Sequence, residues 1–243
     1  MRIVYLCLLA LLLSCSSGPK APSAIYRVGI DPTWYPLDFG PQQAYVNGYT
    51  EDLLLEVARM NGIAFEKISV DPSTLLEDLL KGKYDAVLSS LPPYEFYKAK
   101  YDFSKNTLNT GLVLVVASNT KYEKLSDLSG ELVGIIAGSP AALLIEKNPG
   151  VIIRSYPAIP ALLDAIVNGE IEAAVLDRLP AAAYVRDLYS GKLKTITPSL
   201  TDSGLHAVAK KDSGPLIHLF NKAIDKMEKK HIVSRLEKKW QLQ

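Results

Sequence analysis

The chain has 243 residues, of which 48% are hydrophobic and 22% charged, and its formal net charge is +1. So balanced a charge excludes the basic footprint of a nucleic-acid-binding protein. The 15 glycines and 15 prolines are too few for a fibrous or disordered chain. The two cysteines, Cys7 and Cys15, exclude a disulfide scaffold and a cysteine-rich zinc site. We therefore expect a globular protein with two compact lobes or one large domain.

The first 15 residues, MRIVYLCLLALLLSC, have the pattern of an export signal. Arg2 precedes an apolar run over 3–13 that is too short to span a bilayer, so residues 1–14 are predicted to be a signal peptide. The run ends in LLSC, which resembles the lipobox of bacterial lipoproteins and makes Cys15 the predicted lipidation site, carrying palmitate or a similar chain. A plain secretory signal is the alternative. Residues 15–24 are small and polar, as expected of a tether behind a lipid anchor.

From residue 25 onward, predicted strands alternate with predicted helices. Apolar positions at helical spacing indicate helices, and short apolar runs indicate buried strands. This alternation predicts an α/β fold in which each sheet is mostly parallel and flanked by helices. In chain order we expect a strand at 26–31, a helix at 48–61, a strand at 65–70, a helix at 73–81, strands at 84–90, 112–117 and 132–136, a helix at 141–147, a strand at 151–156, a helix at 159–167, a strand at 206–210 and a helical stretch at 216–240.

One pattern occurs twice along the chain. LLKGKYDAVL at 79–88 resembles IVNGEIEAAVL at 166–176. Each copy is typical of a helix end, a glycine cap (Gly82 or Gly169) and a buried strand. The repetition predicts two α/β lobes of similar design, the second beginning near Gly111.

Motifs for several other chemistries are missing from the sequence. Neither of the phosphate-binding glycine patterns G-x-x-x-x-G-K-S/T and G-x-G-x-x-G occurs, and there is no serine nucleophile elbow. His206, His218 and His231 stand in unrelated contexts without metal-ligand spacing. We therefore predict no metal, no cofactor and no enzymatic activity.

Polar side chains follow four predicted strands, at the carboxyl ends where ligands bind in open parallel sheets. Two of these ends belong to each predicted lobe, so a cleft between the lobes would collect all four. The residues are Asp31 and Trp34 after VGI, Ser89 and Ser90 after AVL, Ser139 after GII, and Asp177 after AAVL.

Opposite charges on the two walls of such a cleft suit a zwitterion, which indicates an amino acid or a close relative. Ionised aspartates hold cations, and the free N–H groups of a helix start attract anions. We expect Asp31, Ser90 and Asp177 to hold the cationic end of the ligand. Ser89, Ser139 and the turn after Ser139 would hold the anionic end.

An aromatic side chain would complete this site, and Trp34 is expected to stack on the body of the ligand. Each element has a simpler alternative. Residues 31–34 also suit a turn with a packed tryptophan, Ser139 an ordinary helix start, and Asp177 a cap for the helix that follows.

In this order and spacing, the residues resemble bacterial periplasmic solute-binding proteins of family 3, which serve amino acids. The likeness covers about 26–240. The resemblance implies a type II, venus-flytrap fold with two lobes and a cleft that closes on its ligand. Lobe 1 would comprise 25–107 and 206–243, lobe 2 would comprise 112–201, and hinge strands would lie near 107–111 and 202–206. The segments that carry the likeness are 28–31, 34–37, 47–53, 80–85, 89–91, 101–104, 128–139 and 168–177.

The family also implies a function and partners. The chain would be the substrate-binding component of an ABC importer, most simply a monomer, and it would deliver its ligand to a membrane permease driven by an ATPase. It would reside in the periplasm or cell envelope, held to a bacterial membrane by lipid alone. Leu91 and Tyr97 join the expected ligand-contacting residues, because they match positions of the family's first-lobe loop.

Three departures from the family pattern affect this site. The family's arginine, which grips the ligand carboxylate, falls at Tyr97, its hydroxyl residue at Pro92, and its second aromatic wall at Pro72. A phenol cannot replace a two-pronged guanidinium, and losing a charge-assisted bond commonly costs about 1.5–3 kcal/mol. Lys98 and Arg178 are the candidate replacement cations.

Several functions remain open at this point. The pocket holds an amino acid without the arginine, or is reshaped for another solute such as a peptide, or no longer serves transport. The alternatives in other classes are a fold-related enzyme, such as a cyclohexadienyl dehydratase, and a sensory or interaction lipoprotein of the envelope.

Overall fold

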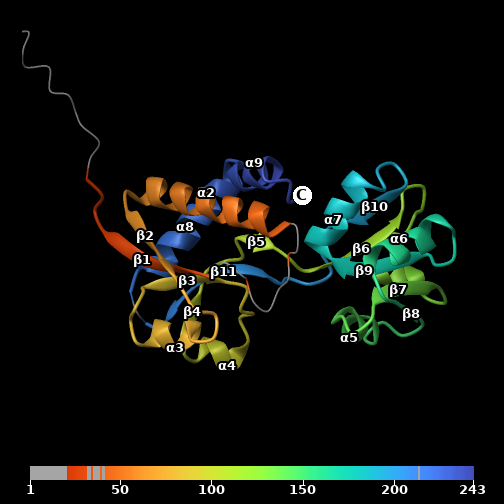
Figure 1. Cartoon of the computed structure of the whole chain (residues 1–243), viewed down its shortest axis with the longest axis horizontal. Helices are drawn as coiled ribbons and strands as arrows, with labels where there is room; N and C mark the ends of the chain where they lie inside the picture. The colour runs from red at the N-terminus through yellow and green to blue at the C-terminus, as the bar shows by residue number, and fades with distance from the viewer. Residues whose placement is uncertain (1–20, 32–33, 35–38, 40–41, 213) are drawn as a thin grey trace, which may run out of the picture.

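The computed structural model describes residues 21–31, 34, 39, 42–212 and 214–243. Two α/β lobes lie side by side along the long axis of the molecule (Figure 1). The predicted signal peptide, Cys15 and residues 35–37 lie outside the described residues. In the described ranges, no helix has the length and hydropathy that a membrane span requires.

Lobe 1 is built on a six-stranded sheet with the order β2-β1-β3-β11-β4, and β5 also pairs with β11. Val28 and Leu88 pack in the core beneath α2, α8 and α9, whereas Val87 and Val208 pack on the other face against α3, because successive strand residues point to opposite faces. The strands are β1 (Ile25–Ile30), β2 (Ala64–Ser69), β3 (Ala86–Ser89), β4 (Tyr101–Phe103), β5 (Leu108–Asn109) and β11 (Gly204–Lys210); the helices are α2 (Gln43–Asn61), α3 (Leu75–Leu80), α4 (Glu95–Lys98), α8 (Leu216–Lys229) and α9 (Ile232–Lys239).

Lobe 2 contains a five-stranded sheet with the order β10-β6-β9-β7-β8. Val113 and Leu176 belong to the core on one face, and Leu114 and Val175 to the core on the other. The strands are β6 (Leu112–Ala117), β7 (Leu132–Ile136), β8 (Ile152–Tyr156), β9 (Ala173–Asp177) and β10 (Leu193–Ile196); the helices are the short 3₁₀ turn η3 (Leu125–Leu128), α5 (Ala141–Ile145), α6 (Ile159–Val167) and α7 (Arg178–Asp187).

Both sheets are mixed, which corrects the expectation of mostly parallel sheets. β1, β2 and β3 are parallel in lobe 1, as are β7, β8 and β9 in lobe 2. β11 and β6 each run antiparallel to these strands. The parallel strands end at the cleft, but β6 and β11 begin there because the chain has just crossed from the other lobe. A crossing strand therefore enters each sheet in the opposite direction.

The repeated sequence pattern corresponds to a repeated structure. Gly82 and Gly169 both adopt left-handed backbone, with φ of 73° and 72°. Gly82 leads from α3 toward β3, and Gly169 leads from α6 toward β9. The two strands then end at the cleft side of their lobes, which places Ser89 and Asp177 at equivalent positions.

Helix ends differ from the sequence pattern in two places. α2 starts at Gln43, five residues before the predicted start, and ends as predicted at Asn61 before a left-handed Gly62. The predicted stretch 216–240 consists of two helices, α8 and α9, because His231 has a left-handed φ of 54° between them. The sequence analysis did not predict β4, β10, η3 or α4. It expected β5 as a hinge strand near 107–111, and α7 only as a helix after Asp177, without bounds.

Candidate functional site

Among the hollows between the lobes, Asp177 lines two. We name each after its lobe 1 residue. The Phe39 hollow, of about 410 Å³, is mostly apolar, and its walls include Phe39, Ile136, Ser139, Ile159, Asp177 and Tyr184. The Tyr94 hollow, of about 350 Å³, is lined partly by the segments that cross between the lobes, and its walls include Tyr94, Thr110, Leu143, Lys147, Asp177 and Ser203.

Asp177 presents to this cleft a carboxylate that has no hydrogen-bond or ion-pair partner among the residues that the structure describes. It is the last residue of β9, paired with Leu112 of β6, and its side chain is exposed. Although it precedes α7, it makes no side-chain cap bond, so capping is not its role here. The surrounding protein raises its pKa above the ordinary 3.8 by desolvation. A bound ammonium group would relieve that penalty, because an opposite charge favours the ionised form.

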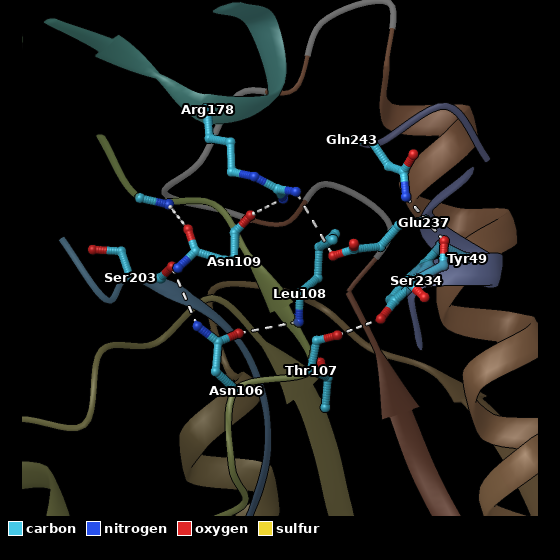
Figure 2. Close-up of polar contacts among 11 residues, drawn as sticks. Tyr49, Asn106, Thr107, Leu108, Asn109, Arg178, Ser203, Ser234, Glu237 and Gln243 are labelled. Carbon is cyan, nitrogen blue, oxygen red and sulfur yellow. Dashed lines mark hydrogen bonds and ion pairs between the residues drawn. The ribbon is translucent and has the colours of Figure 1, made fainter. Parts of the chain in front are cut away.

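Arg178, the next residue, lines neither hollow, and its side chain points toward Asn109 and Glu237 (Figure 2). Its backbone N–H donates to Gly111 O at 2.9 Å, and its Nη1 donates to Asn109 O at 2.9 Å. Its Nη2 lies 3.8 Å from Oε1 of Glu237 in lobe 1. Arg178 therefore bridges the lobes beside the segments that cross between them, and it is not placed to hold a ligand carboxylate.

Two paired segments cross between the lobes beneath the cleft, where the sequence analysis expected a hinge. Leu108 and Asn109 of β5 pair with Leu205 and Gly204 of β11. As Figure 2 shows, the Asn106 side chain accepts a bond from Leu108 N at 3.0 Å and donates to Ser203 O at 3.4 Å. These contacts hold the two crossings side by side at the base of the cleft.

Ser139 is the second predicted site residue that reaches a hollow. Its Oγ already accepts a bond from the backbone of Ala141 at 3.3 Å, as a helix-start serine does. The helix that follows, α5, has only five residues. Its dipole is correspondingly small, so this turn alone is a weak anion site.

The predicted contacts on lobe 1 lie beneath the surface. Asp31, Ser89 and Ser90 are buried and line neither hollow. The Ser90 hydroxyl donates to the backbone O of Trp34 at 3.1 Å, and the Ser89 hydroxyl accepts from Leu91 N at 3.1 Å. The two hydroxyls thus hold the loop together in this conformation, where the sequence analysis expected them to contact ligand.

Trp34 is fully buried in the core of lobe 1. Its indole N–H donates to Asn47 Oδ1 at 2.7 Å. The packed-tryptophan alternative therefore describes this structure, and the ring offers no face to a ligand. The lobe 1 aromatics that line these two hollows are Phe39, five residues later, and Tyr94.

Tyr97 and Lys98, the residues at and beside the family's arginine position, do not line the hollows either. The Tyr97 ring packs against those of Phe96 and Tyr101, with centroids 4.2 and 6.5 Å away. Lys98 pairs with Glu95 at 2.8 Å on the exposed side of α4. Tyr97, which stands at the arginine position of the family, therefore packs within an aromatic cluster.

The sequence analysis missed the cleft residues Phe39, Tyr94, Lys147 and Tyr184. The sequence signal for Tyr94 is weak, because Tyr94 lies in the segment 92–98, which departs from the family pattern. Lys147 follows a short helix and reads as a surface lysine. Only the tertiary arrangement brings it to the same hollow as Asp177.

The described residues contain no group of three His, Cys, Asp or Glu side chains that could hold a metal ion. The fold and the cleft together define a two-lobed binding protein, with an acidic side chain at the junction of two open hollows.

Comparison with known proteins identifies the group to which this architecture belongs. Residues 26–243 match the model for bacterial extracellular solute-binding proteins, family 3. The chain belongs to that family.

Relatives in the family carry amino-acid-binding names. The chain is 26% identical to the histidine-binding periplasmic protein of Escherichia coli K12, over 96% of this chain and 94% of that protein. It is 23% identical to the arginine-binding extracellular protein ArtP of Bacillus subtilis, over 98% and 95%.

Solved structures share the fold. The unliganded, open L-cystine solute receptor of Neisseria gonorrhoeae superposes with a TM-score of 0.72 at 17% identity, covering 90% of this chain and 93% of that one. The second substrate-binding domain of a putative amino acid ABC transporter from Streptococcus pneumoniae gives 0.68 at 21% identity, covering 90% and 100%.

Proposed function

We propose that this protein binds an amino acid between its lobes and delivers it to an ABC permease. The ligand is bound and released without chemical change. The family membership supports this role, and the names of its relatives point to amino acids. The observation that carries the proposal is Asp177, a partly desolvated carboxylate shared by both hollows.

In this proposal Asp177 receives the α-ammonium group of the ligand. Such a charge-assisted bond is strong because the carboxylate has lost part of its water and has no protein partner among the described residues. The Phe39 hollow, walled by Ile136, Ile159 and Tyr184, accepts the apolar part of the ligand.

A thermal-shift screen of the standard L-amino acids and L-cystine, followed by calorimetry on the best binder, tests the role. We expect at least one amino acid to raise the melting temperature. Asp177→Asn should weaken the affinity for that amino acid about tenfold or more. Glu172→Gln removes the same charge at the other end of β9 and should leave the affinity unchanged. The ligand should be recovered unchanged by mass spectrometry. An Asp177→Asn affinity equal to wild type would contradict the placement, and turnover would indicate an enzyme.

The two lobes are proposed to close by bending at 107–111 and 202–206, with lobe 1 comprising 25–107 and 206–243 and lobe 2 comprising 112–201. The paired β5 and β11 and the narrow crossing at the cleft base support this division. Small-angle scattering should show a smaller radius of gyration on addition of the best binder. An unchanged profile at saturation would argue against closure.

We further propose that the protein is a monomer anchored in the cell envelope through lipid on Cys15. The LLSC sequence supports the anchor. Wild type expressed in a bacterium should enter the detergent phase of a Triton X-114 separation, and Cys15→Ser should stay in the aqueous phase. Wild type in the aqueous phase would favour a plain secretory signal.

A further inference from the structure

The structure leaves the ligand carboxylate without its usual partner. At the family's arginine position Tyr97 packs into an aromatic cluster. The two neighbouring candidates are occupied elsewhere, since Lys98 pairs with Glu95 and Arg178 binds Asn109 and Glu237. None of the three lines a hollow of the cleft.

Two cations line hollows between the lobes, Lys147 and Arg186. Arg186 is occupied, because it pairs with Asp187 at 2.7 Å and donates to Gln241 O at 2.9 Å. Among the described residues that form the Phe39 and Tyr94 hollows, the fully charged side chains are Asp177 and Lys147, and both belong to the Tyr94 hollow. Lys147 follows α5 in lobe 2, and its side chain is exposed. Its ammonium makes no ion pair or hydrogen bond with another described residue, unlike the cations of Lys98 and Arg178.

We propose that Lys147 binds the carboxylate of the ligand and so replaces the missing arginine. This assignment rests on the proposed function, because it takes the ligand to be an amino acid. The α-ammonium then lies at Asp177 and the carboxylate at Lys147, with both charged contacts on lobe 2. Lobe 1 contributes Tyr94, a residue that is 58% exposed and so remains free to cover the ligand when the lobes close.

The chemistry of the lysine side chain determines which ligands this site recognises. An ammonium on a four-carbon stem is a mobile point charge, whereas arginine offers a rigid fork matched to a carboxylate. Lys147 therefore requires a negative charge at the ligand end but imposes little geometry on it. The site should select free carboxylates over amides while tolerating variation in the backbone beside the carboxylate.

Ligand pairs that differ only in this charge test the assignment. The best binder of the amino-acid screen and its carboxamide are titrated by calorimetry into wild type, Lys147→Gln, Lys147→Arg and the control Lys121→Gln. Lys121 is exposed, belongs to lobe 2 and lines neither hollow, so its variant makes the same charge change outside the cleft. Melting temperatures of the free variants verify folding.

Wild type and Lys121→Gln should prefer the free acid over the amide by about ten- to a hundredfold. Lys147→Gln should lose most of that preference, because it weakens the binding of the free acid and not that of the amide. Lys147→Arg should restore the preference. If Lys147→Gln keeps the wild-type preference while the acid still binds, the Lys147 assignment is overturned and the proposed function stands. If wild type binds no amino acid, both are overturned.

Discussion

The bridge between Arg178 and Glu237 offers a quantitative test of how the lobes are joined. Both side chains are well shielded, with 16% and 17% of their surface exposed. Arg178 also donates to Asn109 O at 2.9 Å, a charge-assisted bond of about 1.5–3 kcal/mol. At 3.8 Å the ion pair attracts by about 4 kcal/mol at an effective dielectric constant near 20.

Desolvation opposes that attraction. Burial raises the pKa of Glu237 above its ordinary 4.5 even though Arg178 acts to lower it, so shielding costs the carboxylate more than the pair returns. Arg178→Met should therefore destabilise the protein by about 3 kcal/mol, because it removes the bond to Asn109 and leaves Glu237 uncompensated. Glu237→Gln removes the penalty together with the attraction, and should cost less than about 1 kcal/mol at pH 7.

Urea denaturation of the two single variants and the double variant measures these terms. The double variant should recover about 1–2 kcal/mol relative to the sum of the singles. Arg154→Met is the matched control: Arg154 lies at the same 3.8 Å from Glu170, but both side chains are about half exposed, so its loss should cost under about 1 kcal/mol. Equal costs for Arg178→Met and Arg154→Met would refute the reasoning.

The pH dependence has a definite sign. A carboxyl whose folded-state pKa is raised contributes stability below its unfolded value, and that contribution is lost as the pH rises through the folded value. Glu237 and Asp177 both have raised pKa values. The free energy of unfolding should therefore lose part of its value as the pH rises above about 4.5, and Glu237→Gln should remove that part of the slope.

Three further changes test other parts of the structure. Burial lowers the pKa of His206 below 6.5, so the free energy of unfolding should fall as the pH drops below that value. His206→Phe should reduce this dependence in melting curves recorded at a series of pH values. Trp34→Phe should cost about 1 kcal/mol by losing the bond to Asn47 while ligand affinity stays within about threefold; a large affinity loss at unchanged stability would place the ring in the cleft. Gly48→Ala would put its Cβ 2.2 Å from the Trp240 ring, so the tryptophan emission should shift, and an identical spectrum would contradict that contact.

Most of the fold could be predicted from local sequence patterns. The glycine caps at Gly82 and Gly169 and the apolar runs of β3 and β9 are short-range signals, and the structure confirms them. The direction of β6 and β11 was not predictable in the same way. It depends on where the chain crosses between lobes, and no residue type marks that crossing.

The candidate site also contains residues that local patterns predict and residues that only tertiary packing brings to the cleft. Asp177 stands at the carboxyl end of a buried strand, and ligands bind at such ends in open α/β sheets. The cleft position of Asp177 could therefore be predicted, and in the structure Asp177 lines the cleft. Trp34 belongs to an irregular segment, where the choice between core and cleft depends on contacts with distant elements such as Asn47 of α2. Lys147 and Phe39 reach the cleft only through tertiary packing, which leaves no periodic trace in the sequence.

The placement of charge separates capture from closure in this cleft. If Asp177 and Lys147 grip the two ends of the ligand, lobe 2 alone provides the electrostatic recognition, before the lobes move. Tyr94 on lobe 1 and Leu143 on lobe 2, which are 58% and 65% exposed in the same hollow, then add apolar burial as the cleft closes. Recognition of the charged ends thus precedes the contact with Tyr94, because both charged groups belong to lobe 2 and Tyr94 belongs to lobe 1.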